Sequence, residues 1–247
     1  MNEIGGIFFE SEIRPAPRRD GLFKGWPLEH LYMFPILLFS IIVHEISHGW
    51  MALKLGDPTA RDLGRLTLNP IPHIDPVGSV LVPLISYLSA GTVFIAWAKP
   101  VPVNPLNFKN YRRDDILVSL IGPLSNFIVA LGCAVLLVIF RKLAPSEGDA
   151  VAIPEYAAIF FARMFSYGIA MNIYLAVFNL IPVPPLDGSH LVSSLLPPVL
   201  GERYRQVGFA GILVILLLMR LEPVRNAVIS TVQFILIPYS LLIGFLS

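Results

Sequence analysis

Long apolar runs separated by short polar connectors make up most of this chain. Six such runs stand out, at about 31–53, 78–98, 116–140, 164–181, 207–221 and 227–246. A helix of about 20 apolar residues crosses the roughly 30 Å hydrocarbon layer, because each residue rises 1.5 Å. The run 78–98 is interrupted by Pro83, Ser86 and Gly91 and is either a span or a re-entrant segment. The pattern predicts an all-α polytopic membrane protein with five or six transmembrane helices.

The connectors predict short irregular pieces between the first and third spans. Residues 65–68 (Arg-Leu-Thr-Leu) alternate polar and apolar side chains, which is typical of a β-strand. Residues 99–115 begin with three prolines in seven positions, so their first part cannot be helical. Residues 1–26 are basic and proline-containing and lack the long apolar stretch of a signal peptide. We therefore expect a polar segment over 1–26 and a single membrane-embedded domain over 27–247.

Composition and charge narrow the class of protein. Of 247 residues, 55% are hydrophobic and 14% are charged, against roughly 25% charged in an average soluble domain. The mean hydropathy of +0.70 agrees with a chain that has lipid as its main solvent. A net charge of +1 excludes binding to nucleic acid through a basic surface. Cys133, the single cysteine, excludes an intramolecular disulfide and a thiolate-rich zinc site.

The most informative polar positions lie inside the first apolar run. His44 and His48 are four residues apart, so both imidazoles lie on one helix face and can reach one zinc ion. Glu45 lies between them, where its carboxylate can deprotonate a metal-bound water. Ionisable groups deep in a membrane cost on the order of 2.5–3.5 kcal/mol each even on a lenient scale. The cluster therefore predicts a shared buried metal centre.

A catalytic zinc has three protein ligands, and the sequence offers more than one candidate for the third. Asp187 is the best candidate, because it follows a proline-rich break at the end of an apolar run, and irregular backbone at membrane depth must line a cavity or be buried. The alternative is that Asp187 caps a helix beginning at 189. His190 is a rival or auxiliary ligand, and His73 and Asp75 either assist the metal or order a loop near it. Asn126, Asn172 and Asn179 are intramembrane amides, which often link helices by hydrogen bonds.

Three separated motifs together resemble the site-2 protease family of intramembrane zinc metalloproteases (peptidase M50), and the resemblance covers about residues 40–190. They are the pentapeptide 44–48 (HEISH), residues 122–126 (GPLSN) and residues 179–188 (NLIPVPPLDG). The segments 64–70, 73–76 and 98–105 are similar to those of the small prokaryotic members. Unlike many relatives, this chain has no convincing apolar segment before 31 and no insert of PDZ or CBS size.

This resemblance implies a function as well as a fold. One zinc ion would be bound by His44, His48 and Asp187, with Glu45 as general base for attack of a zinc-bound water on the peptide carbonyl. Asn126 would help to hold the substrate. Single-span membrane proteins or peptides are the expected substrates, bound in extended form against a strand edge at 65–68. The expected location is the cell membrane, with multiple spans in the bilayer.

Two other classes of protein share some of these features. A polytopic ion or metal transporter could use His44, Glu45 and His48 as a relay, although such transporters often have two similar halves and this chain shows none. A non-catalytic zinc-binding membrane protein would retain the ligands without needing Glu45. The intact Glu45 therefore favours the protease.

Overall fold

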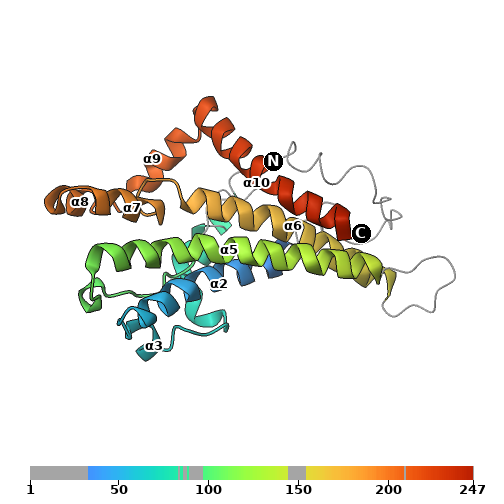
Figure 1. Cartoon of the computed structure of the whole chain (residues 1–247), viewed down its shortest axis with the longest axis horizontal. Helices are drawn as coiled ribbons and strands as arrows, with labels where there is room; N and C mark the ends of the chain where they lie inside the picture. The colour runs from blue at the N-terminus through green and yellow to red at the C-terminus, as the bar shows by residue number, and fades with distance from the viewer. Residues whose placement is uncertain are drawn as a thin grey trace.

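Four long helices form the body of the protein, seen here in a computed structural model that describes residues 33–82, 84, 85, 88, 97–143, 154–208 and 210–246 (Figure 1). They are α2 (Met33–Lys54), α5 (Tyr111–Lys142), α6 (Glu155–Asn179) and α10 (Glu222–Leu246), and each is long and apolar enough to span a membrane. The predicted segment 1–26 and most of the run 78–98 lie outside the described residues. The all-helical class is confirmed for the described residues, which contain four candidate spans, while the predicted number of five or six stays a prediction.

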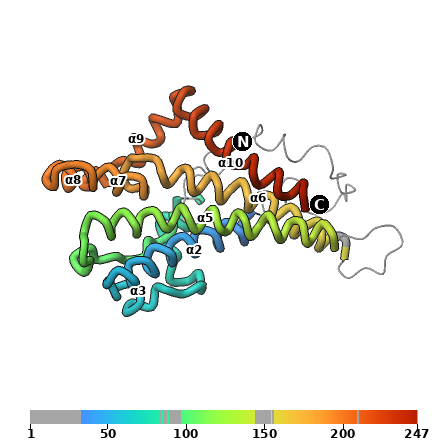
Figure 2. Tube along the Cα trace, viewed as in Figure 1, coloured from blue at the N-terminus to red at the C-terminus, as the bar shows by residue number. Residues whose placement is uncertain are grey.

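Short elements connect these helices. They are α3 (Thr59–Asp62), η2 (Ile71–His73), the π-helical η3 (Pro76–Leu81), η4 (Pro105–Asn107), α7 (Gly188–Leu195), α8 (Pro198–Arg205) and α9 (Ala210–Leu218). The tube view shows α3, α7 and α8 at the same end of the bundle, with α3 on one side of α5 and α7 and α8 on the other (Figure 2). This end therefore brings together segments from both halves of the chain.

Two predicted elements differ from the structure. The run 207–221 was expected to span, but α9 has nine residues, about 14 Å of helix, which is too short to cross the hydrocarbon. A turn precedes it, where Gly208 adopts a positive φ of 47° that side-chain-bearing residues rarely adopt. Residues 66–68 form bends instead of the strand predicted over 65–68, and none of the described residues is in a β-strand.

The core lies where α5 packs against α2, α6 and α10. Its buried side chains include Ile36, Cys133, Leu137, Phe165, Ile173, Val232 and Leu236. The outward faces of the same helices are also apolar, with Ile128, Leu241 and Phe245 more than 60% exposed. Apolar surface on both the inside and the outside is what a helix bundle in lipid requires.

A buried carboxylate, that of Asp57, connects the segments that follow α2 at this end of the bundle. The Asp57 side chain, 0% exposed, accepts hydrogen bonds from Thr59, from the Asn104 backbone N–H and from the Asn107 amide. Burial alone would raise the pKa of Asp57, but these hydrogen bonds outweigh it, so the pKa lies below its usual range. Asp57 thus joins the end of α2 to the connector that precedes α5.

Candidate active site

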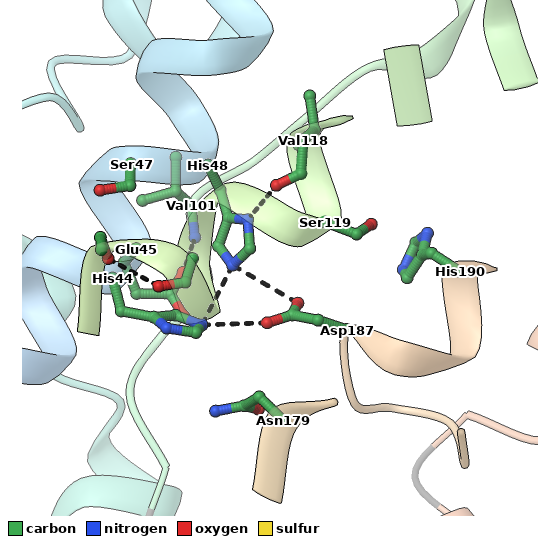
Figure 3. A network of polar contacts seen from close by, with 12 residues as sticks. His44, Glu45, Ser47, His48, Val101, Val118, Ser119, Asn179, Asp187 and His190 are labelled. Atoms are coloured by element: carbon green, nitrogen blue, oxygen red, sulfur yellow. Dashed lines mark hydrogen bonds and ion pairs between the residues drawn. The ribbon is translucent and has the colours of Figure 1, made fainter. Parts of the chain in front are cut away.

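Three side chains from two distant parts of the chain converge inside the bundle (Figure 3). The Nε2 atoms of His44 and His48 are 3.1 Å apart, and the Asp187 carboxylate lies 3.1 Å from the first and 3.4 Å from the second. The side chains of His44, His48 and Asp187 are 10%, 11% and 18% exposed. Within the described part of the chain, these three are the group of His, Cys, Asp and Glu side chains close enough to share one ion.

Asp187 reaches the histidines because the helical structure is interrupted between α6 and α7. The residue occupies the N-cap position of α7, but its side chain makes no capping hydrogen bond and points towards the histidines. The carboxylate is thus not used in the way that the capping alternative required.

A buried ionic cluster holds α7 in place against α5. Asp115, 4% exposed, accepts a 2.9 Å hydrogen bond from Arg205 on α8 and lies 3.1 Å from Nδ1 of His190 on α7. Arg205 also donates to Ser193 of α7 and to the Tyr111 hydroxyl. His190 therefore bonds Asp115 and lies outside the group of three side chains that could share an ion.

The hydrogen bonds behind the two imidazoles determine which ring nitrogens face the centre. His48 Nδ1 lies 2.6 Å from the backbone carbonyl of Val118, which can only accept, so Nδ1 carries the proton. His44 Nδ1 lies 2.6 Å from Oδ1 of Asn126, which likewise accepts. In the neutral imidazoles, both Nε2 atoms then present lone pairs to the centre. These two Nε2 atoms are 3.1 Å apart.

Such a cluster of facing lone pairs fits a zinc ion. Four ligands at 2.0–2.1 Å in tetrahedral geometry lie about 3.3–3.4 Å from one another, close to the separations found here. Asp187 Oδ2 is buried and receives no hydrogen bond, which is costly unless a cation satisfies it. Two imidazole nitrogens and one carboxylate oxygen are also a usual catalytic zinc set, which leaves a fourth position for water.

One face of α5 provides the wall of this centre. Asp115, Ser119, Gly122 and Asn126 follow one another at helical spacing along it. A Cβ atom on Gly122 would come within 2.4 Å of His48 Nε2 and 2.8 Å of His44 Cε1. Glycine at this position therefore makes room for both imidazole rings.

Glu45 is oriented by the proline-rich connector. Its Oε2 accepts a 2.7 Å hydrogen bond from the Val101 backbone N–H. This approach depends on Gly49, one turn further along α2, where a Cβ would lie 2.7 Å from the Val101 side chain. The Arg65 guanidinium, 8% exposed as a residue, donates to the carbonyls of Lys99 and Pro100 and so supports the same connector.

The role of Arg65 explains why 65–68 is not a strand. Its side chain binds carbonyls of the connector, and the prolines at 100 and 102 lack the N–H groups that a ladder needs. His73 and Asp75 order nearby loops: His73 Nε2 lies 2.9 Å from the Thr67 carbonyl, and Asp75 caps η3. Neither belongs to the group that could share an ion.

Asn126 was predicted to help hold the substrate, and this remains a prediction. Its side chain is 0% exposed and its amide is occupied by His44 and Asn172. The sequence does not predict the contacts of the Val101 N–H with Glu45 and of the Val118 carbonyl with His48, because the backbone of any residue type can make them. The stripe on α5 was detectable, since its spacings of four, three and four residues define one helix face.

Comparison with known proteins agrees with this geometry. Residues 32–219 match the profile of the family described as peptidase family M50. YwhC of Bacillus subtilis (strain 168) is 39% identical over 200 residues, which cover 79% of this chain and 84% of that protein. Rip2 of Mycolicibacterium smegmatis is 27% identical over 198 residues, covering 77% and 70%. Both carry the designation "putative zinc metalloprotease". No solved structure gives a significant match.

Proposed function

The chain belongs to peptidase family M50 and is a zinc metalloprotease by that membership, and we propose that it hydrolyses peptide bonds of membrane-embedded substrates. The observation that carries this proposal is the convergence of His44, His48 and Asp187 beside helices long and apolar enough to span a bilayer. A water-consuming reaction at such a site needs a polar centre enclosed by apolar helices, and this bundle has one.

His44, His48 and Asp187 would hold the zinc ion. When bound, zinc polarises a water molecule and the substrate carbonyl and stabilises negative charge on oxygen. The protein contributes the orientation of the ligands. The bonds from Nδ1 of His44 to Asn126 and from Nδ1 of His48 to Val118 keep both rings turned with Nε2 inward.

Glu45 would move the proton. Its Oε2 is held by the Val101 N–H, and among the described residues this is the single hydrogen bond that the carboxylate accepts. The other oxygen, Oε1, is therefore available to take a proton from water and to return it to the departing amine. Restraining one oxygen leaves the other in a defined direction, which favours proton transfer over free rotation of the side chain.

We propose that the substrate is cleaved in extended form beside Glu45. A helical substrate must unwind before cleavage, because its carbonyls are already hydrogen-bonded. The bends at 66–68 offer no strand edge, and the Val101 N–H of the neighbouring connector is already bonded to Glu45, so neither segment is assigned as a partner strand for the substrate. Substrate Gly, Pro or Asn residues would ease unwinding, so replacing them with Leu should slow cleavage. Undiminished cleavage would contradict this step.

Single-span membrane proteins are the proposed substrates, and the cell membrane is the proposed location. The test uses the full chain in detergent or liposomes with a panel of single-span peptides, comparing the wild type with Glu45→Gln. The substitution should leave the zinc content unchanged and abolish cleavage, because it removes the proton acceptor and no ligand. Equal cleavage by both forms would refute the role of Glu45. Zinc retention without cleavage by the wild type would favour a non-catalytic protein.

A further inference from the structure

We propose that Asn172 and Ser40 are positioning residues that fix the ring orientation and proton position of His44 from behind, through Asn126. The inference rests on the proposed metal site and adds residues outside the three motifs that define it. Asn172 lies on α6, Ser40 on α2 and Asn126 on α5, so three different helices meet in one buried hydrogen-bond chain.

Every link of this chain is short, and its three outer members have 0% exposure. His44 Nδ1 lies 2.6 Å from Asn126 Oδ1, and Asn126 Nδ2 donates to Asn172 Oδ1 at 2.9 Å. Asn172 Nδ2 donates to Ser40 Oγ and to the Gly168 carbonyl, each at 2.8 Å. Ser40 Oγ donates to the Ile36 carbonyl at 2.6 Å.

Two backbone carbonyls at the far end of this hydrogen-bond chain determine which group donates and which accepts at every link. The carbonyls of Ile36 and Gly168 can only accept hydrogen bonds. Ser40 must then offer a lone pair to Asn172, and Asn172 must turn its NH₂ group towards Ser40 and Gly168. Its Oδ1 is left to face Asn126.

The same order of donors and acceptors continues to the metal site. Because Asn172 presents an oxygen, Asn126 must present its NH₂ group to Asn172 and its oxygen to His44. His44 then carries its proton on Nδ1, and Nε2 keeps a lone pair directed at Asp187. Without Asn172, the Asn126 amide could rotate by half a turn and offer NH₂ to Nδ1. The His44 proton would then move to Nε2 and compete with the metal.

Close packing of the helices makes these short side chains sufficient. A Cβ on Gly168 would lie 2.8 Å from both Cys133 Sγ and Ile36 Cγ1, so glycine lets α6 approach α5 and α2. Ser40, Asn126 and Asn172 are fully buried, and hydrogen bonds between polar groups are stronger in such surroundings than in water. A general interhelical link would need only one pair of groups, whereas this chain continues without a gap to a ring that faces the metal centre.

The test measures zinc affinity of the purified full chain in detergent micelles by competition with a chelator. Asn172→Leu should weaken zinc binding by about 10–100-fold, the usual effect of losing a partner that orients a ligand. Ser40→Ala removes one of two acceptors for Asn172 and should give a smaller loss. Ser125→Ala is the control, because this buried hydroxyl bonds only the Gly122 carbonyl of its own helix, and it should bind zinc normally.

A second substitution distinguishes the effect of hydrogen-bond direction on zinc affinity from the effect of Asn172 packing. In Asn126→Asp, both side-chain oxygens accept, so His44 keeps its proton on Nδ1 whichever way the carboxylate turns. Adding Asn172→Leu or Ser40→Ala to this variant should therefore cause no further loss of zinc affinity. If the loss persists in the Asn126→Asp background, Asn172 acts by packing and the proposal is overturned. Wild-type zinc affinity in the single Asn172→Leu variant would overturn it equally.

The proton position can also be observed directly. Nitrogen-15 NMR of histidine-labelled, zinc-free protein distinguishes protonated from unprotonated ring nitrogens, and a His44→Ala spectrum identifies the signals of His44. The wild type should show a protonated Nδ1, and Asn172→Leu a mixture of both forms. If Asn172→Leu does not fold, Ser40→Ala carries the same comparison. Absence of zinc binding by the wild type, or no effect of His44→Ala, would instead refute the metal site itself.

Discussion

Replacing Gly122 with alanine tests whether the site depends on the space that α5 leaves for the two imidazoles. The added Cβ would lie 2.4 Å from His48 Nε2, 2.5 Å from His48 Cε1 and 2.8 Å from His44 Cε1. Ordinary contact begins at about 3.4 Å, so the His48 ring must retreat by roughly 1 Å. The ring cannot move freely, because its Nδ1 is hydrogen-bonded to the carbonyl of Val118, which lies on α5 one turn before Gly122.

The size of the effect follows from the tolerance of metal sites. Ligand distances in zinc sites hold to about 0.2 Å, so a ring displaced by about 1 Å no longer coordinates well. Misplacing a reacting group by that distance costs about 100-fold, which corresponds to about 2.7 kcal/mol. We therefore expect Gly122→Ala to lower zinc affinity and peptide cleavage by at least about 100-fold.

The assay compares this variant with Gly132→Ala on the same helix. A Cβ on Gly132 meets nothing within 4 Å, and alanine is the better helix former by about 1 kcal/mol. Zinc affinity by chelator competition, cleavage of a single-span peptide and the zinc-free Tm are measured for both. Gly132→Ala should match the wild type in activity and melt no lower. If Gly122→Ala binds zinc and cleaves as well as Gly132→Ala, the space argument is wrong.

Three further predictions concern the metal, α7 and acid stability. Zinc at 100 times its Kd should stabilise the wild type by about 2.7 kcal/mol against chelator-treated protein, which is measured as a rise in Tm. Asp187→Ala should lose most of this rise. An equal rise in Asp187→Ala would exclude Asp187 as a ligand. Arg205→Gln leaves the Asp115 carboxylate buried without its cation, so both Tm and zinc affinity should fall, and an unchanged Tm would contradict this. The lowered pKa of Asp57 means that its stabilisation is present above about pH 4 and is lost as the pH falls through the folded-state pKa. The Tm of Asp57→Asn should therefore depend less on pH in acid than that of the wild type, and parallel curves would contradict it.

Apolar runs predicted the long helices well and their ends poorly. The runs 116–140 and 164–181 correspond to α5 and α6, which begin at Tyr111 and Glu155, several residues earlier than expected. Charged residues such as Arg112 and Arg163 end an apolar run, but they do not end a helix. The run 207–221 was misjudged for the opposite reason, because its composition is apolar while Gly208 and a turn after Leu218 limit the helix to nine residues.

The candidate site was predictable where side-chain identity determines the chemistry. His44, Glu45 and His48 follow from their spacing in an apolar helix, and Asp187 from its place in a proline-rich break. Contacts made by backbone groups, such as the Val101 N–H on Glu45, carry no sequence signal. The bond between Asn126 and Asn172 depends on how α5 and α6 are rotated against each other, which a single sequence does not specify.

The position of the histidines along α2 has a consequence for the products. Lys54, whose ammonium lies 3.6 Å from the Trp50 ring, is in the last turn of this helix, and such pairs suit the boundary between lipid and water. His48 and His44 lie six and ten residues before it, about 9 and 15 Å along the axis. Under the proposed function, a substrate bond cut at that level would lie about 9–15 Å from this boundary, and 15 Å is the midplane of the roughly 30 Å hydrocarbon layer. At least one fragment would then keep no more than about half of the apolar residues that a span needs, so it would be held less firmly than the uncut helix.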